Sequence, residues 1–287
     1  MTDSFPRISN SATGKQIRLN RILGSGWRTL MVPLDDALIS GPIGRLADSA
    51  ALFNDIIDAG CDSVLAFSGT LSLVPSGVRI GRVLNVTAST IRTTHTKKIV
   101  VSGVEQAMRM GADGIAVHVN VGSRFESEML STLGTTCQRA DRDGMPVIAI
   151  MYPRTEDGAG DNNFDDLYAQ NPKHYSELVS HACRIGQELG ADIIKTQYTG
   201  TPESFSRVVQ CSHPVPILVA GGRKVEPLVA LERAYEVLEA GGSGVSFGRN
   251  IHQRNECSAA LLKALSGLMH RTLSLDAARD LVVNSHC

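Results

Sequence analysis

Gly190-Ala-Asp-Ile-Ile-Lys195-Thr-Gln-Tyr-Thr-Gly200 places a lysine at the end of a short apolar run bounded by glycines. Such a run is typical of a strand buried on both faces, and lysine is among the residues least often fully buried. In a barrel of parallel strands, Lys195 would lie at the carboxyl end of its strand. Desolvation there would lower its pKa and leave a nucleophilic amine. A lysine that extends to solvent or pairs with a structural carboxylate explains this segment equally well.

Further apolar runs alternate with helical patterns on both sides of this stretch. We expect strands at residues 29–33, 62–67, 82–87, 115–119, 146–151, 216–220 and 244–247, besides the lysine strand. We expect helices at 43–59, 102–110, a long one ending near 143, 172–189, 202–211, 227–240 and 254–271. Strands that are apolar throughout favour a parallel sheet covered on both faces, and eight of them favour closure. The sequence predicts an α/β fold, a (β/α)8 TIM barrel in a single domain.

The predicted barrel covers residues 29–271, between an N-terminal arm (1–28) and a C-terminal tail (272–287). The polar arm either packs under the barrel or stays mobile. Three connections between a helix and the next strand share a similar motif: Ala59-Gly60-Cys-Asp62, Gly111-Ala-Asp113 and Gly190-Ala-Asp192. A glycine ends each helix and turns the chain into the strand, so we interpret the motif as structural.

Composition limits the classes of partner. With 287 residues, 43% of them hydrophobic, the chain can form one large core. Its net charge of -1 provides no long-range attraction to nucleic acids or anionic membranes, so we expect a small ligand and neither of those partners. The six cysteines lack metal-like spacing and are expected to be reduced thiols. The polar N-terminus and the lack of a membrane-length apolar run lead us to expect a cytoplasmic protein.

Several reactive side chains follow predicted strands and would converge at one mouth of the barrel. Tyr152, next to Lys195 in strand order, could relay a proton to a substrate hydroxyl, although such a tyrosine is more often a packing residue. Asp35 could accept a proton during iminium formation or cap the following helix. His118 is a minor candidate, since a histidine at a strand end is more often structural. The converging residues are Asp35, Asp36, His118, Tyr152, Lys195, Lys224 and Arg249.

Two glycine turns, residues 220–224 and 246–250, follow the seventh and eighth strands. Glycines allow backbone N–H groups to approach an anion closely, and loops at these positions hold phosphate in many barrels. The sequence predicts a phosphorylated ligand bound by Gly221, Gly222, Lys224, Gly248 and Arg249. No His and carboxylate cluster suggests a metal, so we expect no metal and no cofactor, with the carbonyl chemistry carried by Lys195.

These landmarks together resemble the archaeal-type class I fructose-bisphosphate aldolases and their relatives, over residues 29–255. Two motifs, residues 117–123 and 151–154, are more similar to the 2-amino-3,7-dideoxy-D-threo-hept-6-ulosonate synthase branch and related enzymes of secondary metabolism. The resemblance implies that Lys195 forms a Schiff base, Tyr152 transfers a proton, Asp35 assists and the two glycine turns hold phosphate. It also implies a homo-oligomer, with a decamer as one form. The matching motifs are residues 32–35, 41–43, 117–123, 151–154, 190–200, 219–222 with Lys224, and 248–250 with Gln253.

The chain departs from the family at the first strand, where Asp35-Asp36-Ala37 stands in place of Asp-His-Gly. The extra carboxylate would repel an anionic part of a substrate or favour a cationic amino group. Residues 155–171 form a longer loop than expected and are predicted to act as a lid. Both features favour a specialised pathway enzyme.

We therefore expect a class I aldolase or transaldolase-type synthase. It would join a phosphorylated keto donor, such as dihydroxyacetone phosphate or a deoxyketohexose phosphate, to an aldehyde such as aspartate semialdehyde. Two alternatives stay open: a thiolase-like acyl transferase that acts on a phosphorylated dione, and a barrel that binds sugar phosphates without catalysis.

Overall fold

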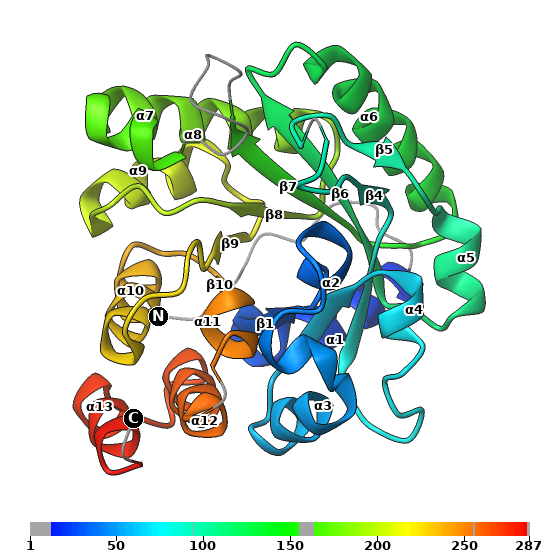
Figure 1. The fold of residues 1–287 in the computed structure, drawn as a ribbon. Coiled ribbons are helices and arrows are strands. Elements are labelled where there is room, and N and C mark those ends of the chain that lie inside the picture. Colours follow the sequence, from blue (N-terminus) through cyan, green and yellow to red (C-terminus); the bar gives the residue numbers. More distant parts are fainter. Residues whose placement is uncertain (1–12, 94, 155–163, 255, 286–287) are drawn as a thin grey trace.

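Eight parallel strands form a closed barrel in the computed structural model, which describes residues 13–93, 95–154, 164–254 and 256–285 (Figure 1). The hydrogen-bonded order around the barrel is β1-β10-β9-β8-β7-β6-β3-β2. The (β/α)8 prediction is confirmed, and every expected strand is present. The barrel strands are β1 (Thr29–Pro33), β2 (Ser63–Ala66), β3 (Gly81–Asn85), β6 (Gly114–Val121), β7 (Val147–Pro153), β8 (Ile193–Thr196), β9 (Ile217–Ala220) and β10 (Gly244–Ser246).

The strands are apolar throughout because both of their faces are buried. On β7, Ile148, Ile150 and Tyr152 belong to a cluster inside the barrel, whereas Ala149 and Met151 belong to the layer beneath the helices. Alternate residues of a strand point to opposite faces, so one continuous apolar run supplies two cores.

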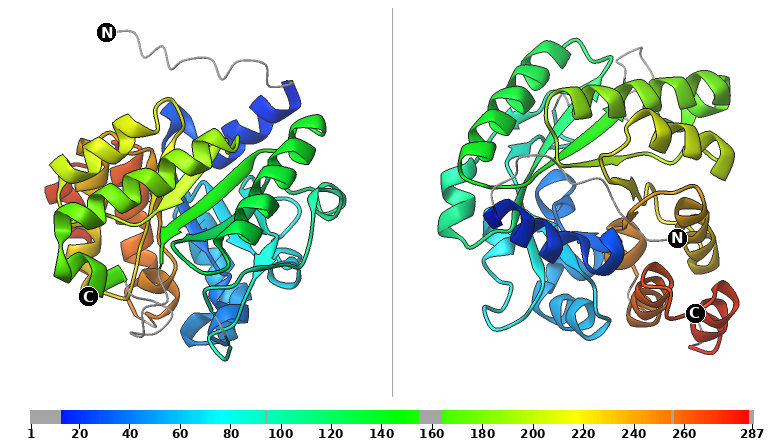
Figure 2. Two further views of the ribbon diagram at one scale, coloured as in Figure 1. Left: turned by 90° about the horizontal axis from the view of Figure 1, so that it is seen from above. Right: turned by 180° about the vertical axis from the view of Figure 1, so that it is seen from behind.

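Helices surround the barrel on its outside (Figures 1 and 2). Local signals fix several of their starts: in α9, Thr201 forms a capping box with Ser204 and Pro202 occupies the first turn. The helices along the barrel are α3 (Ser49–Asp58), α4 (Ser68–Leu71), α5 (Val104–Arg109), α6 (Glu126–Arg142), α8 (Pro172–Glu188), α9 (Pro202–Cys211), α10 (Pro227–Glu239) and α12 (Ser258–Met269).

Two predicted helices are shorter than expected. The first begins at Ser49, because Asp48 caps it by accepting a hydrogen bond from the Ala51 N–H (3.3 Å), and the preceding residues form the short helix η2 (Gly44–Ala47). The last, expected from residue 254, begins at Ser258 as α12, because Cys257 before it has a non-helical φ of 65°. A separate short helix, α11 (Arg249–His252), precedes it.

Helix α1 (Thr13–Leu23) lies across the amino-terminal end of the barrel (Figure 2, right). Its Leu19, Ile22 and Leu23 are buried and belong to the interior cluster, which they extend downward. Residues 13–23 of the predicted arm therefore pack under the barrel, while residues 1–12 lie outside the described residues. A short 3-10 helix, η1 (Ser25–Trp27), leads from α1 into β1.

The repeated motif, Gly60-Cys-Asp62, Gly111-Ala-Asp113 and Gly190-Ala-Asp192, joins three helices to the strands that follow them. The glycines have φ of 69°, 66° and 90°, a region in which other residues are strained. The aspartates also bind basic side chains: Asp113 binds Arg21 of α1 (2.9 Å), Asp192 binds Lys15 of α1 (3.0 Å), and Asp62 binds His270 (3.1 Å). Each aspartate accepts a backbone N–H of an adjacent strand: Asp62 from Leu30 (2.8 Å), Asp113 from Arg82 (3.1 Å) and Asp192 from Val147 (2.9 Å).

Further elements have no counterpart in the sequence prediction. The segment between β3 and β6 contains an antiparallel pair, β4 (Thr87–Ala88) and β5 (Ile99–Val100). Helix α2 (Asp36–Ile39) follows β1, and α7 (Phe164–Gln170) lies within the predicted lid loop, of which residues 155–163 lie outside the described residues. Helix α13 (Leu275–Val283) lies in the predicted tail and buries Ala278 and Val282.

Cysteine chemistry differs from the expectation at one position. Cys61, Cys137, Cys183 and Cys211 are free thiols. Cys257 is disulfide-bonded, so the expectation of six reduced thiols is wrong there. Sequence spacing could not indicate this bond, because spacing identifies local motifs and not pairs that tertiary structure brings together.

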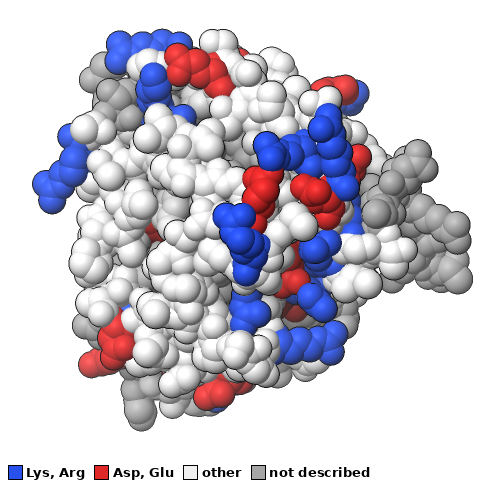
Figure 3. All heavy atoms as spheres, turned by 90° about the vertical axis from the view of Figure 1, so that its right-hand side faces the viewer, with Lys and Arg blue, Asp and Glu red and all other residues white. Residues whose placement is uncertain are grey.

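Basic and acidic side chains lie next to one another on the face over α5 and α6 (Figure 3). Arg139 of α6 pairs with Glu105 of α5, and Lys97 Nζ lies 3.2 Å from Glu128. These pairs are exposed and therefore contribute little stability. Among the described helices, none is both long and apolar enough to span a membrane.

Candidate active site

Lys195 lies inside the barrel because it shares the inward face of β8 with Ile193. Its register partners are Ile150 on β7 and Leu218 on β9, which both belong to the interior cluster. The lysine is only 5% exposed and lines a cavity of about 170 Å³. The alternative in which this lysine extends to solvent is therefore wrong.

Tyr152 lies in the same cavity, near the end of the neighbouring strand β7. Its ring packs edge-on against His118, with centroids 4.8 Å apart, and the Arg154 guanidinium lies 5.8 Å from the ring centroid. Burial raises the pKa of Tyr152, although the positive charges of Lys195 and Arg154 oppose the rise. The phenol therefore retains its proton and can donate it to an oxygen that becomes negative.

Asp35 follows β1 and reaches the cavity from the opposite side of the barrel. Asn85 at the end of β3 donates a hydrogen bond from Nδ2 to its Oδ2 (3.0 Å). Burial raises the pKa of Asp35; the Lys195 charge opposes this rise and the Asp36 carboxylate adds to it. The environment thus shifts Asp35 toward its neutral form relative to an exposed aspartate. Asp35 precedes α2, but its side chain makes no capping hydrogen bond to that helix.

Asp36 also lines the cavity, in a different environment from Asp35. Its Oδ2 lies 3.1 Å from Nε2 of His252, which is completely buried on α11. Burial alone would raise the pKa of Asp36, but the hydrogen bond and charge of His252, with Arg249 and Lys195, outweigh burial and lower it. Two adjacent carboxyl groups with opposite pKa shifts suit different proton-transfer roles.

His118 is buried within this cavity, and its Nε2 lies 3.0 Å from Oδ1 of Asn120. Burial lowers the pKa of His118 well below its ordinary value, and the positive charges of Lys98 and Arg154 add to the effect. The imidazole is therefore neutral, donates to the amide oxygen and positions the Tyr152 ring. This arrangement favours a structural role for His118 over direct catalysis.

The two glycine turns lie side by side at the ends of β9 and β10. Gly221, Gly222, Gly248 and Arg249 line the cavity with Lys195, and Asn250 donates a hydrogen bond to the Gly221 carbonyl (3.0 Å), which links the turns. A Cβ on Gly248 would lie 2.8 Å from the Pro33 carbonyl oxygen, and one on Gly221 would lie 2.9 Å from Asn250 Nδ2. The close packing explains why glycine occupies both positions.

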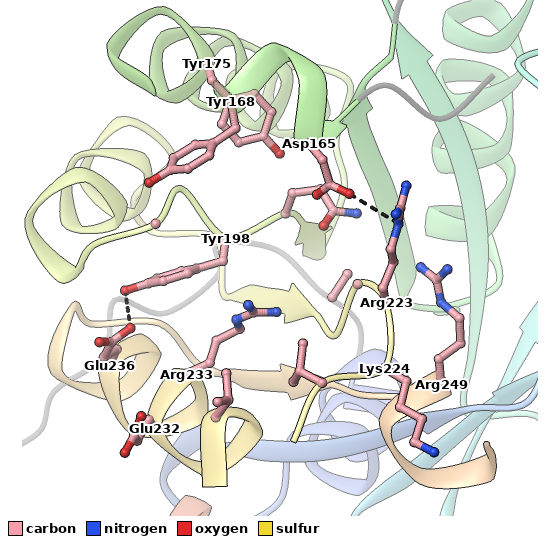
Figure 4. Close-up of a pocket in the computed structure, with 16 residues that line it drawn as sticks. Asp165, Tyr168, Tyr175, Tyr198, Arg223, Lys224, Glu232, Arg233, Glu236 and Arg249 are labelled. Carbon is pink, nitrogen blue, oxygen red and sulfur yellow. Dashed lines mark hydrogen bonds and ion pairs between the residues drawn. The ribbon is translucent and has the colours of Figure 1, made fainter. Parts of the chain in front are cut away.

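Lys224 does not share this cavity and instead lines an adjacent pocket of about 650 Å³ (Figure 4). The two are contiguous, since Gln197, Ala220, Gly222 and Arg249 line both. In the adjacent pocket, Tyr198 donates to Glu236 (2.8 Å) and Arg223 pairs with Asp165 of α7 (3.2 Å). Lys224 is thus the one member of the predicted phosphate-binding set that lies outside the cavity that contains Lys195.

Four cavity-lining or supporting residues were given no role by the sequence: His95, Lys98, Arg154 and His252. Arg154 lies within the Met-Tyr-Pro-Arg motif and follows the end of β7, which is a signal that it could have been included. His95 and Lys98 belong to a segment without regular polarity, and tertiary structure, including the β4 and β5 pairing, places them along the cavity.

Comparison with known proteins gives the chain's family. The model of the DeoC/LacD family aldolases matches residues 29–254. The chain is 35% identical over 267 residues to 2-amino-3,7-dideoxy-D-threo-hept-6-ulosonate synthase of Halobacterium salinarum, covering 92% of this chain and 95% of that protein. It is 31% identical over 275 residues to 2-amino-4,5-dihydroxy-6-oxo-7-(phosphonooxy)heptanoate synthase of Streptomyces griseus, covering 94% and 95%.

Solved structures agree. An archaeal fructose 1,6-bisphosphate aldolase matches with a TM-score of 0.78 and 27% identity, covering 90% of this chain and 99% of that one. A second archaeal aldolase structure, whose catalytic lysine is covalently bound to a carbinolamine intermediate, has the same TM-score and identity and covers 89% and 99%. The family predicted from the motifs is confirmed. The chain belongs to the DeoC/LacD family of aldolases, as an enzyme of the class I type.

Proposed function

We propose that Lys195 forms a Schiff base with a phosphorylated ketone and that the resulting enamine adds to an aldehyde. One observation carries this proposal: the buried amine of Lys195 lines the same cavity as Tyr152, Asp35 and the two glycine turns. The turns hold the donor phosphate through backbone N–H groups and Arg249. The donor carbonyl then faces the Lys195 amine.

The first half of the reaction releases one water. The amine of Lys195 adds to the ketone to give a carbinolamine, and the hydroxyl group leaves with a proton from the neutral acid Asp35. This leaves an iminium and an Asp35 carboxylate. The carboxylate removes the proton from the adjacent carbon, which gives an enamine and restores the acid.

The second half forms the carbon–carbon bond and consumes one water. The enamine carbon attacks the aldehyde carbon, and the new alkoxide takes the proton of Tyr152. Water then adds to the iminium and returns a proton to the Tyr152 phenolate. Asp35 carries the remaining proton from the carbinolamine hydroxyl to nitrogen, which frees the product and the Lys195 amine. Donor and acceptor are thus joined without net gain or loss of atoms.

The relatives' products suggest the substrates. The Streptomyces griseus enzyme is named for a seven-carbon product with hydroxyl groups on carbons 4 and 5, a ketone on carbon 6 and a phosphate on carbon 7. Aldol cleavage between carbons 4 and 5 gives 2-amino-4-oxobutanoate, which is aspartate semialdehyde, and dihydroxyacetone phosphate. We propose the same pair for this chain. The ionised Asp36 in the cavity favours an acceptor that bears an ammonium group.

Borohydride trapping tests the covalent step. The protein is incubated with dihydroxyacetone phosphate and reduced, and its peptides are mapped by mass spectrometry. We expect an adduct on Lys195 in the wild type and none in Lys195→Met. A wild-type protein that binds the donor in a thermal shift assay but forms no adduct would show a sugar-phosphate-binding barrel without this catalysis.

A further inference from the structure

The β4–β5 segment brings a second group of basic side chains to the mouth. Ser89 holds two of them: Lys98 Nζ donates to Ser89 Oγ (2.6 Å), and His95 Nδ1 lies 3.0 Å from the same oxygen. Asn120 of β6 donates to the Thr96 carbonyl (2.8 Å) and fixes the segment to the barrel. The position of Lys98 is therefore fixed by the fold.

Arg154 reaches the same space from the end of β7. Its backbone N–H donates to Val121 O on β6 (2.9 Å), and its guanidinium lies over the Tyr152 ring. Arg154 is 4% exposed and Lys98 is 7% exposed, and both line the cavity that contains Lys195. Two cations from separate elements therefore lie in the cavity beside Tyr152.

The field of this pair is positive at the mouth. Burial lowers the pKa of His95 to about 3, and the charges of Lys98 and Arg154 contribute to that shift. The same two charges act on His118. Asp36 faces His95 and opposes the shift without reversing it. An anion that enters this part of the cavity is attracted to it.

The order of the strands places this pair opposite the predicted phosphate site. The two glycine turns follow β9 and β10, Lys195 lies on β8, and Tyr152 and Arg154 follow along β7, with the β4–β5 segment beyond. A substrate bonded to Lys195 with its phosphate at the turns therefore extends past Tyr152 toward Lys98 and Arg154. The reacting aldehyde lies at Tyr152, so the far end of the acceptor meets the cations.

We propose that Lys98 and Arg154 form an anion subsite that holds the carboxylate or phosphate at the far end of the aldehyde acceptor. The proposal rests on the proposed function of Lys195 and adds the chemistry of the second substrate. Both anions accept charge-assisted hydrogen bonds from lysine and arginine. Because the contact lies beyond the reacting carbon, it discriminates among acceptors and leaves the donor half of the reaction unchanged.

The test compares three acceptors with dihydroxyacetone phosphate as donor: 2-amino-4-oxobutanoate with a carboxylate, glyceraldehyde 3-phosphate with a phosphate, and uncharged glyceraldehyde. In Lys98→Met we expect a higher KM for the anionic acceptor that binds the subsite, by roughly 10-fold or more. The kcat/KM for glyceraldehyde and the borohydride adduct on Lys195 stay at wild-type levels. The anionic acceptor whose kcat/KM falls more in Lys98→Met shows whether the subsite binds a carboxylate or a phosphate.

Lys97→Met is the matched control, because Lys97 is the adjacent residue, carries the same charge and is 40% exposed beside Glu128. It should leave all three acceptors unchanged. Lys98→Arg keeps the charge and should recover part of the lost affinity, and Arg154→Gln should repeat the selective loss. Equal losses for charged and uncharged acceptors, or no loss for any, would overturn the subsite.

Failure of the proposed function gives a different result. If wild-type protein forms no adduct on Lys195, the Schiff-base mechanism is wrong. The subsite is then decided by thermal shift with 2-amino-4-oxobutanoate and with glyceraldehyde 3-phosphate, in wild type and in Lys98→Met. A stabilisation by either compound that the variant loses supports the subsite, and equal shifts in both proteins contradict it.

Discussion

The residues that line the cavity are of two kinds. Some follow directly after a barrel strand, and others lie on the β4–β5 segment between two barrel strands. Lys195, Tyr152 and Asp35 were predictable, since each follows an apolar run and a barrel brings strand ends together. Lys98 was not predictable, because its position depends on an antiparallel pairing of only Thr87 with Val100 and Ala88 with Ile99. Such a short pair leaves too weak a pattern in the sequence.

The phenol of Tyr152 gives the sharpest test at this scale. Tyr152→Phe keeps the ring contact with His118 and removes only the proton that we assign to the alkoxide. We expect kcat to fall about 10²- to 10⁴-fold while borohydride still traps the donor on Lys195. Tyr235→Phe, on an exposed residue of α10, serves as the control. Loss of the adduct in Tyr152→Phe would contradict a role confined to the later proton transfer.

The Asp36–His252 hydrogen bond predicts a pH dependence of stability. The pKa of Asp36 is lowered in the folded protein from its ordinary value of 3.8, so its ionised form stabilises the fold. That contribution is complete above the unfolded pKa and is lost as the pH falls through the folded pKa. Urea unfolding of wild type and Asp36→Asn should therefore show a difference that is constant near neutral pH and shrinks below about pH 4. A difference that does not change with pH would contradict the assignment.

At the scale of elements, strands were easier to predict than the helices at the two ends of the chain. Helix α1 was not predicted because most of its residues are polar and its apolar contacts come from Leu19, Ile22 and Leu23 alone. Even its Lys15 is buried, where it pairs with Asp141 and Asp192. The helix forms because the open end of the barrel needs a cover, which is a requirement of tertiary structure.

The contact between α1 and β3 can be tested at Gly81. A Cβ at this position would lie 2.6 Å from the backbone oxygen of Arg21, which cannot move without shifting α1. We expect Gly81→Ala to lower the free energy of unfolding by about 1–3 kcal/mol in urea titrations. Gly77→Ala, where nothing lies within 4 Å, should have little effect. Equal stabilities of the two variants would mean that α1 is not held closely against β3.

At the scale of the whole molecule, closure depends on the contact between the first and the last strand. The eight apolar runs predicted the barrel, but they could not show how tightly β1 and β10 meet. Gly244 has a φ of 141° and packs directly on the backbone of Thr29, its register partner. No side chain can be accommodated there, and the requirement is visible only once the sheet closes.

Gly244→Ala should therefore affect folding as a whole. A Cβ would lie 2.0 Å from the Thr29 carbonyl oxygen, so either the strand pair opens or the backbone shifts. We expect a loss of at least about 3 kcal/mol, seen as a lower urea midpoint and a smaller yield of folded protein. Gly69→Ala, with open space around it, is the comparison. Unchanged stability of Gly244→Ala would show that the barrel can close with β1 and β10 farther apart.

The helix beneath the barrel has a kinetic consequence. Because α1 fills one end with Leu19, Ile22 and Leu23, donor, acceptor and product must all use the remaining entrance. In the proposed reaction the ketone binds at Lys195 and the aldehyde binds nearer the opening, so we expect ordered turnover with the donor first. We expect high acceptor concentrations to slow turnover, because an aldehyde that binds first would block the path of the donor.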